Sequence, residues 1–184
     1  RYGCAKLIGE FLAMDYWKED GLPVLIVRLF NTVGPRQSSR YGMVMPRFIK
    51  QALSDQPITV FGDGRQSRCF TYVTDVVEAM VNLSEHPEAF GQIFNIGSEE
   101  EVTIQELAMK IKELTGSKSE VRYIPYEVAY KEGFQDLRRR VPGLQKIRRY
   151  LRYEPLCLDE ILVNIVEHHR SKSQTTIVPV RAFV

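Results

Sequence analysis

Residues 1–30 read RYGCAKLIGEFLAMDYWKEDGLPVLIVRLF, and this stretch decides the fold class. Its first two-thirds has the spacing of an amphipathic helix over residues 2–19. The apolar side chains of that helix recur four and three residues apart: Leu7, Phe11, Met14 and Trp17. Residues 24–30 then form an almost continuous apolar run, which is typical of a strand buried on both faces of a parallel sheet. A helix followed by such a strand is half of a repeating β-α unit, so the sequence predicts an α/β protein.

The remaining elements alternate in the same way. Helical patterns occupy residues 43–54, 74–85, 103–115, 144–151 and 158–170. Strand patterns occupy residues 58–61, 68–73, 92–97 and 121–126. Thr103 and Glu106 have the spacing of a capping box, Gly116 closes that helix, and Asp75 is expected to cap the helix that begins beside it. Residues 171–184 carry no periodicity that assigns them a structure.

Composition excludes several classes of protein. With 44% apolar and 26% charged residues the chain is an ordinary globular protein, and a net charge of +2 is too small to indicate nucleic acid or a membrane as a partner. No apolar run approaches the roughly 18 residues of a membrane span, so a cytoplasmic protein is expected. The cysteines are too few and too widely spaced for a disulfide framework or a zinc site: Cys4, Cys69 and Cys157. No metal is therefore expected.

A Y-x-x-x-K pair, Tyr2 and Lys6, begins the first helix. Residues four apart lie one above the other on the same helical face, which brings the ammonium close to the phenol. Lowering a tyrosine pKa from about 10 to about 7 takes roughly 4 kcal/mol, which two nearby cations can supply in a closed site. The motif is therefore a candidate for base catalysis, although on its own the same spacing more often marks a surface pair.

Further motifs follow that pair in a specific order. RLFNTVGPRQ ends the buried strand, GDGRQSRCFTYVTDVV follows, and QIFNIGSEEEVTI comes third. This order resembles the extended short-chain dehydrogenase/reductase family, and within it the NAD-dependent nucleotide-sugar epimerases, decarboxylases and dehydratases, over essentially residues 1–170. The resemblance implies the C-terminal part of a Rossmann-type doubly wound parallel sheet plus a small α/β substrate-binding domain.

The resemblance also implies a division of the chain into domains. Residues 1–42 would end the NAD-binding domain and residues 43–170 would mostly bind the nucleotide sugar. Within the second range, residues 68–97 would return a helix and a strand to the first sheet, and residues 171–184 would be a tail.

Roles at matching positions follow from the same resemblance. Tyr2 would take the proton from the sugar hydroxyl, and Lys6 would bind the nicotinamide ribose and lower the tyrosine pKa, so both would also contact NAD. The other residues expected near NAD lie in the loop after the strand: Thr32, Val33 and Arg36. The residues expected at the UDP- or dTDP-linked sugar are Asn31, Val44, Met45, Arg47, Val60, Phe61 and Arg68. Of these, Asn31 and Arg68 would contact the diphosphate, and a guanidinium suits that task because it binds phosphate oxygens in a forked geometry.

The Gly-rich dinucleotide fingerprint is absent from the 184 residues, and Arg1 opens directly into a helix without a capping residue. We therefore expect that sequence upstream of Arg1 has been lost, that the chain alone is inactive, and that its full-length parent is an NAD-dependent enzyme and a homodimer. The residues that separate epimerisation from dehydration and decarboxylation also lie upstream in the family. Sugar 4-epimerisation through a 4-keto intermediate is favoured as the commonest outcome. The alternatives are UDP-glucuronate decarboxylation, dTDP-sugar 4,6-dehydration, an inactive fragment that binds sugar nucleotides, and an interaction protein without catalysis.

A cluster of seven cations lies between residues 138 and 152: Arg138, Arg139, Arg140, Lys146, Arg148, Arg149 and Arg152. Relatives carry an R-R-x-P-D segment here, whereas this chain has Gly143 in place of the acid. No aromatic stacking pattern accompanies the cluster, so nucleic-acid binding is not predicted.

Overall fold

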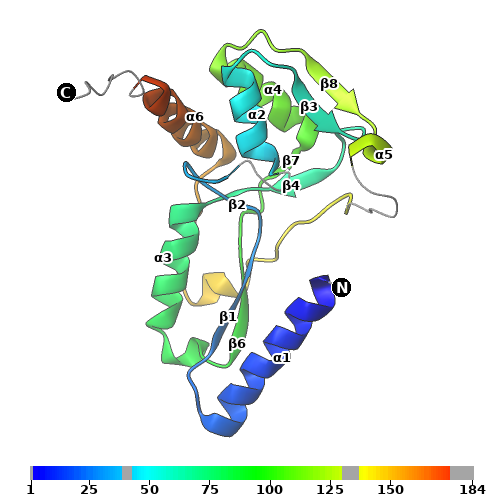
Figure 1. Cartoon of the computed structure of the whole chain (residues 1–184). Helices are drawn as coiled ribbons and strands as arrows, with labels where there is room; N and C mark the ends of the chain where they lie inside the picture. Colours follow the sequence, from blue (N-terminus) through cyan, green and yellow to red (C-terminus); the bar gives the residue numbers. More distant parts are fainter. Residues whose placement is uncertain (1, 39–42, 130–136, 175–184) are drawn as a thin grey trace, which may run out of the picture. The chain divides into compact units, whose positions relative to one another are not determined.

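The computed structural model describes residues 2–38, 43–129 and 137–174, which are drawn in colour in Figure 1. The chain divides into two compact units, and each is described by itself. Unit 1 comprises Arg1–Thr32, Cys69–Glu101 and Val141–Leu156. Unit 2 comprises Val33–Arg68, Val102–Arg140 and Cys157–Val184. Three short strands lie where the chain passes between the units: β2 (Thr32–Val33), β4 (Ser67–Cys69) and β7 (Glu101–Thr103).

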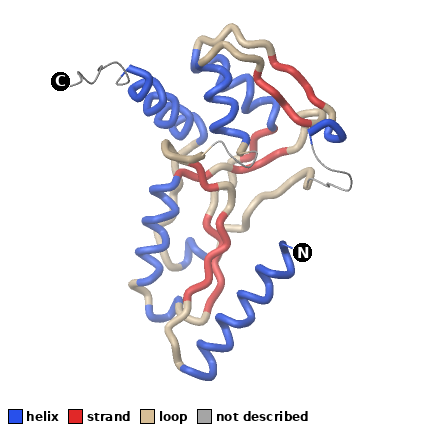
Figure 2. Tube along the Cα trace, viewed as in Figure 1, coloured by secondary structure: helices blue, strands red, loops and turns tan. Residues whose placement is uncertain are grey.

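Unit 1 is built on two parallel strands, β1 (Leu25–Leu29) and β6 (Gln92–Ile96), which lie side by side in Figure 2. Their register pairs Leu25 with Gln92 and Leu29 with Ile96. The other elements of the unit are α1 (Tyr2–Asp20), β5 (Thr71–Tyr72), α3 (Val73–Ser84) and the 3₁₀ turns η2 (Pro87–Ala89) and η3 (Ile147–Arg149). The α/β class with parallel strands, predicted from the alternation of apolar patterns, is confirmed.

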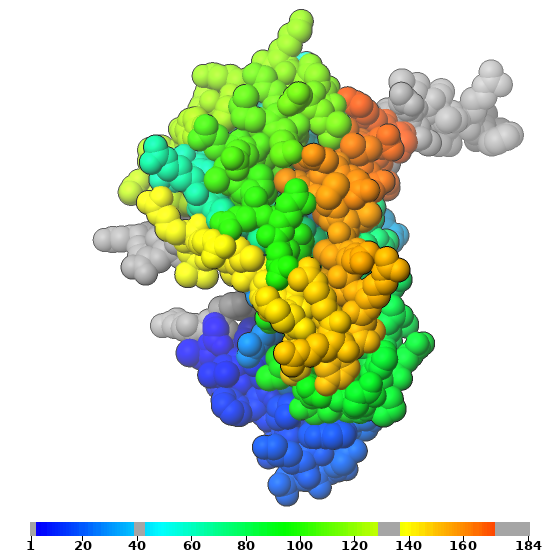
Figure 3. Space-filling model, turned by 180° about the vertical axis from the view of Figure 1, so that it is seen from behind, coloured from blue at the N-terminus to red at the C-terminus, as the bar shows by residue number. Residues whose placement is uncertain are grey.

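The core of unit 1 lies between α3, β6 and residues 141–156. The side chains that α3 buries are Val76, Ala79 and Leu83. They pack in one cluster with Phe94 and Ile96 of β6 and with Leu144, Ile147 and Tyr153. Figure 3 shows the segment 141–156, in yellow and gold, next to the green surface of α3. A segment more than 40 residues downstream in the chain therefore completes this core.

Helix α1 is attached to the strands mainly through its C-terminal half. The Trp17 ring lies 6.5 Å from that of Phe90 and against Gly91, whose positive φ of 71° and lack of a side chain leave room for the indole. Arg28 of β1 donates to both carboxylate oxygens of Glu10, at 2.7 and 2.6 Å. Both contacts lie on the helix face that turns toward β1 and β6.

Two expectations about this first stretch are wrong. Leu7 is 50% exposed and Phe11 is 68% exposed, so the predicted apolar stripe is only partly buried. Strand β1 is not buried on both faces, because Arg28 and Leu29 are exposed. The reason is that among the described residues β1 pairs with β6 alone, whereas burial of both faces requires more neighbouring layers.

Unit 2 has its own parallel pair, β3 (Ile58–Phe61) and β8 (Val121–Ile124), with Ile58 opposite Val121. Its helices are α2 (Val44–Leu53), α4 (Ile104–Thr115), the short α5 (Tyr126–Ala129) and α6 (Leu158–Gln174). The predicted capping box of α4 is confirmed, since Thr103 and Glu106 each accept a main-chain hydrogen bond from the other. Gly116 closes α4 in the left-handed conformation, as predicted.

Several predicted elements differ in detail. The strand expected at 68–73 is two short strands, β4 and β5, and the helix expected at 144–151 is the single turn η3. Helix α6 continues to Gln174, four residues into the expected tail. Asp75 does not cap α3, whose N-cap is Tyr72; its carboxylate accepts the main-chain N–H of Leu156 at 2.9 Å instead. For Asp75, a tertiary contact outweighs the local pattern.

Candidate functional site

The predicted site residues are divided between the two units. Unit 1 holds the two residues expected to be catalytic, one expected at the diphosphate and one expected near NAD: Tyr2, Lys6, Asn31 and Thr32. Unit 2 holds the residues expected at the nucleotide, together with Val33 of β2 and Arg36 of the loop after it. The residues expected at the nucleotide are Val44, Met45, Arg47, Val60, Phe61 and Arg68.

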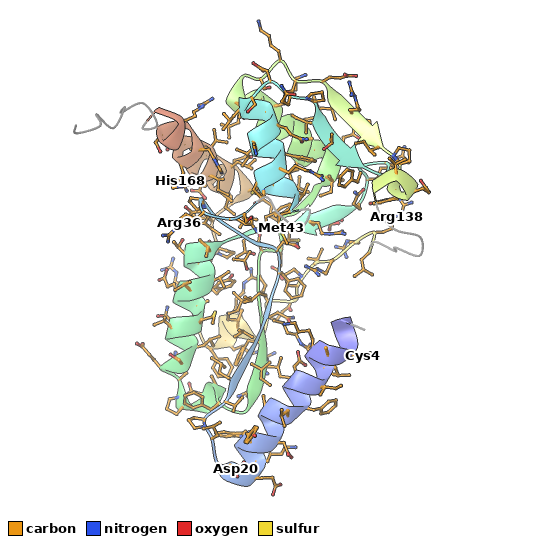
Figure 4. All side chains as sticks on the ribbon, viewed as in Figure 1. Cys4, Asp20, Arg36, Met43, Arg138 and His168 are labelled. Atoms are coloured by element: carbon orange, nitrogen blue, oxygen red, sulfur yellow. The ribbon has the colours of Figure 1, made fainter. Side chains whose placement is uncertain are left out.

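Tyr2 and Lys6 lie four residues apart in the first turns of α1. Lys6 is exposed, while the side chain of Tyr2 is outside the described part of the structure. Figure 4 labels Cys4, which lies between the two in sequence and is also exposed. The main chain therefore sets both residues on one helix, as the motif predicts, and their catalytic roles stay predictions.

Asn31 follows β1 in a strained conformation. Its φ is +37°, a left-handed value that asparagine tolerates better than other residues with a side chain. The side-chain amide donates to the carbonyl of Cys69 at 2.7 Å, and the Asn31 carbonyl accepts the N–H of Thr71 at 3.3 Å. Asn31 thus ties the end of β1 to the segment that leads into α3. A strained backbone conformation persists only where surrounding contacts hold it, and residues of this kind cluster at functional sites.

Arg47 and Phe61 come together in unit 2. The guanidinium carbon of Arg47, on α2, lies 4.0 Å from the centroid of the Phe61 ring, at the end of β3. The same guanidinium donates to the carbonyl of Thr59 at 3.1 Å. Gln51, one turn further along α2, both accepts from the main-chain N–H of Thr59 at 3.1 Å and donates to its hydroxyl at 3.0 Å. Gln51 was not predicted, and only its polar character on an otherwise buried helical face could have indicated its role.

The start of α2 presents main-chain groups. Met43, labelled in Figure 4, occupies the N-cap position and has no side-chain oxygen with which to cap the helix. Val44 is half-buried in the first turn, while the side chains of Met45 and of Val60 in β3 are buried in the core of unit 2. Any contact that Met45 or Val60 makes with a ligand must therefore use main-chain atoms.

Arg68, in β4, is half-buried and oriented by main-chain carbonyls. Its Nη1 donates to the carbonyl of Ser67 at 2.6 Å and to that of Leu137 at 2.8 Å. The sequence predicted a guanidinium on the diphosphate and did not predict the contact with Leu137, which is 69 residues away. Two carbonyls on one nitrogen fix the plane of the guanidinium, and a fixed plane is what forked recognition of phosphate requires.

Thr32 and Val33 of β2 and Arg36 of the loop after it complete the predicted set. The side chain of Val33 is buried, and that of Arg36, labelled in Figure 4, is exposed. Thr32, the residue before the unit boundary, is half-buried. Their expected position near NAD stays a prediction.

The arginine cluster is paired with acids and carbonyls. Arg148 donates to Glu99 at 2.7 Å, Arg152 lies 3.3 Å from Glu154, and Lys146 donates to the carbonyl of Ile93 at 2.9 Å. The contacts of Arg148 and Lys146 bind residues 141–156 to the rest of unit 1, whereas the Arg152–Glu154 pair lies within that segment. Lys146 and Arg148 therefore have a structural role in unit 1.

Neither a membrane span nor a metal centre is found within the ranges that the structure covers. None of the described helices combines the length and apolar character needed to cross a bilayer. Nor do histidine, cysteine, aspartate and glutamate side chains gather there in threes or more around a possible ion.

Comparison with known proteins identifies relatives along most of the chain. Residues 1–97 match the model of the NAD dependent epimerase/dehydratase family. UDP-N-acetyl-alpha-D-glucosaminuronate decarboxylase of Bacillus cytotoxicus is 43% identical over 155 residues, which are 84% of this chain and 48% of that protein. UDP-glucuronic acid decarboxylase 1 of Arabidopsis thaliana is 36% identical over 93% of this chain and 38% of its own length. This chain thus spans less than half of either relative.

A solved structure shows the same likeness in three dimensions. UDP-glucuronic acid 4-epimerase of Bacillus cereus, in complex with UDP-glucuronic acid and NAD, superposes with a TM-score of 0.81 and 31% identity. The match covers 93% of this chain and 52% of the epimerase.

Proposed function

The chain belongs to the NAD-dependent epimerase/dehydratase family, and we propose that it supplies the catalytic tyrosine and the nucleotide-binding unit of an enzyme that oxidises a UDP-linked sugar acid. The observation that carries the proposal is that the family match extends over the Tyr2 and Lys6 helix as well as over Phe61 and Arg68. Unit 1 would then be the end of a Rossmann-type sheet and unit 2 the substrate-binding domain.

The substrate class is proposed from the relatives. Two decarboxylases and one epimerase of high similarity are named for UDP-linked uronic acids. Their reactions differ, but they share a UDP group and a sugar carboxylate. We therefore place a UDP-linked hexuronic acid ahead of a neutral UDP-sugar or a dTDP-sugar as substrate.

Proton transfer would fall to α1. Tyr2 would remove the proton from the C4 hydroxyl of the sugar, and Lys6 would favour the phenolate because a cation lowers the pKa of a nearby acid. NAD, if bound, would supply the acceptor for the hydride that leaves the same carbon. Loss of the hydride from C4 and of the proton from its hydroxyl leaves a ketone at C4.

The described residues fit only one end of NAD. Lys6 and Arg36 are exposed cationic donors of the kind that hold a ribose hydroxyl or a carboxamide. A Gly-rich turn for the pyrophosphate is absent from the sequence. Cofactor binding by the 184 residues alone would therefore be weak, and the proposed activity belongs to a protein that also contains such a turn.

Unit 2 would hold the nucleotide. The uncapped amides of Val44 and Met45 and the planar pair formed by Arg47 and Phe61 suit a base that carries both hydrogen-bonding edges and a π-face. Arg68 would meet the diphosphate with a guanidinium whose plane is already set. Pre-setting of this kind reduces the entropy that binding must overcome.

The reaction that follows oxidation can take two courses. A C4 ketone in a uronic acid is a β-keto acid, so loss of carbon dioxide from C5 becomes easy. Return of the hydride to the opposite face gives the 4-epimer instead. The sequence pattern favoured epimerisation as the commonest outcome, whereas the relatives named above support decarboxylation at least as strongly. We propose decarboxylation first, with 4-epimerisation as the second candidate.

Binding of the nucleotide is tested by calorimetric titration of UDP and of UDP-glucuronic acid into the 184-residue chain. We expect both to bind, and we expect no NAD-dependent turnover from the chain alone. Turnover by the purified chain would show that the missing Gly-rich turn is not needed.

The catalytic role of α1 is tested in a chimera that places the N-terminal half of the Bacillus cytotoxicus relative before Arg1. We expect Tyr2→Phe to remove at least about 90% of its turnover, a loss of more than about 1.4 kcal/mol of transition-state stabilisation. Lys6→Met should raise the pH at which activity appears. An active Tyr2→Phe chimera would exclude the tyrosine as the base.

A further inference from the structure

Leu137 and Arg138 are bound to the turn and strand that follow β3 by three hydrogen bonds. Arg68 Nη1 donates to the carbonyl of Leu137 at 2.8 Å, and the main-chain N–H of Ser67 donates to the carbonyl of Arg138 at 2.9 Å. The third bond is an ion pair in which Arg138 Nη1 lies 2.8 Å from Asp63 Oδ2. We call residues 137–140 the strap; Figure 4 labels Arg138 in it.

The three bonds differ in their surroundings. Ser67 is buried, so its main-chain bond to the strap is shielded from water, whereas the bond from Arg68 to the carbonyl of Leu137 is exposed. The ion pair is exposed, since the side chain of Arg138 is 78% accessible. Exposed ion pairs are weak and sensitive to salt, so this contact opens easily.

The carboxylate of Asp63 is oriented by a hydrogen bond within its own turn as well as by the ion pair. Its Oδ1 accepts the main-chain N–H of Arg65 at 3.0 Å, which fixes the carboxylate within its own turn. That N–H, and after it the guanidinium of Arg138, hold the pKa of Asp63 below its ordinary value. The carboxylate is therefore charged at neutral pH and points its second oxygen at Arg138.

We propose that the Asp63–Arg138 ion pair is a latch that keeps the strap against Arg68, and that the latch is coupled to the binding of a phosphate group at that guanidinium. The coupling, but not the latch, rests on the function proposed above. The guanidinium of Arg68 is the shared element, because the same side chain binds the strap carbonyl and would bind the diphosphate.

The coupling follows from the geometry of Arg68. The carbonyl of Leu137 is one of two that fix its Nη1, so release of the strap removes part of the support that orients the guanidinium. A less oriented guanidinium binds phosphate less tightly, because more freedom is lost on binding. Linkage then requires the reverse effect as well, so that a bound phosphate group holds the strap closed by the same factor.

Limited digestion with trypsin measures the latch without any nucleotide. The strap contains three consecutive trypsin sites, Arg138, Arg139 and Arg140. A protease needs an opened segment, so the rate of cleavage reports how often the strap leaves its place. In the 184-residue chain, Asp63→Asn should be cut in the strap several-fold faster than the wild type.

The matched control is Asp159→Asn. It removes the same charge and an equally exposed ion pair, Lys110–Asp159 at 2.7 Å, from another part of unit 2. Arg138→Gln breaks the latch from the other side, keeps the bond between Asp63 and the Arg65 N–H, and leaves two cleavage sites. We expect faster strap cleavage in Asp63→Asn and Arg138→Gln and a wild-type rate in Asp159→Asn, with unchanged melting temperatures within about 3 °C.

UDP and inorganic phosphate then test the coupling. UDP at saturation should slow strap cleavage in the wild type several-fold, and Asp63→Asn should weaken UDP binding. Equal cleavage of Asp63→Asn, Asp159→Asn and wild type would overturn the latch. UDP that binds the wild type without slowing cleavage would overturn the coupling alone. Failure of UDP to bind the wild type at all would instead contradict the proposed function, while the cleavage rates would still decide the latch.

Discussion

The guanidinium of Arg47 and the ring of Phe61 form a stack, with the guanidinium carbon 4.0 Å from the ring centroid. The stack joins the first turns of α2 to the end of β3, and the bond from Arg47 to the Thr59 carbonyl keeps it in place. The side chains of Arg47 and Phe61 therefore serve two purposes. They pack unit 2, and they form the proposed contact with a nucleotide base.

Arg47→Gln should lower the free energy of unfolding by about 1–2 kcal/mol, because it removes a cation–π contact and a charge-assisted hydrogen bond to a main-chain carbonyl. UDP affinity should fall as well. Lys50→Gln removes the same charge from an exposed position on the same helix and should change neither quantity. Urea denaturation and calorimetry measure the two effects, and equal stability of the two variants would mean that the stack contributes nothing.

Asn31 is expected to be sensitive to substitution for two separable reasons. Asn31→Ala loses the bond to the Cys69 carbonyl and also places an unsuited residue at φ +37°. Asn31→Gly loses only the bond, because glycine adopts that conformation readily. The alanine variant should therefore be less stable than the glycine variant by about 1 kcal/mol, and less stable than wild type by about 2 kcal/mol. Identical denaturation midpoints for the two variants would mean that the positive φ at residue 31 costs the alanine variant no stability.

Tyr153 should make the stability of unit 1 depend on alkaline pH. Burial, and after it the charge of Asp75, raises its pKa from 10.0 to about 12, and its hydroxyl donates to the carbonyl of Gly97 at 2.9 Å. The unfolded chain therefore loses this proton first. The stabilisation is complete below pH 10 and is lost as the pH rises toward 12.

Urea denaturation at pH 8 and at pH 11 measures this effect. Tyr153→Phe should cost about 1–3 kcal/mol at pH 8, since the Gly97 carbonyl is left without its donor, and the difference from wild type should shrink at pH 11. Tyr16→Phe, at an exposed position in the same unit, serves as the control. A gap that stays constant with pH would mean that Tyr153 does not keep its proton as described.

Arg68→Lys should raise the dissociation constant of UDP about tenfold, equivalent to 1.4 kcal/mol, because an ammonium cannot reproduce forked bonds to phosphate. Arg65→Lys, an exposed arginine in the preceding turn, should leave it unchanged. Calorimetric titration distinguishes the two. Equal UDP affinity of wild type and Arg68→Lys would mean that Arg68 holds the strap but does not bind the diphosphate.

The local elements of this protein could be read from its sequence because each depends on residues a few positions apart. The capping box of Thr103 and Glu106, the left-handed Gly116 and the parallel strands around Ile26 and Phe94 follow from such short-range patterns. So does the placement of Tyr2 and Lys6 on one helix. Local backbone preferences and the period of apolar side chains determine these features wherever the segment lies.

Contacts between distant segments were decided only by the tertiary structure. No local pattern indicates that Arg68 binds the carbonyl of Leu137, that Asp75 accepts from Leu156, or that Asp63 faces Arg138. Nor does sequence alone show that Val60 is buried while Phe61 beside it lies under Arg47. These facts depend on which surfaces bury one another when segments tens of residues apart meet, and a carbonyl or carboxylate is bound by whichever donor that packing brings within reach.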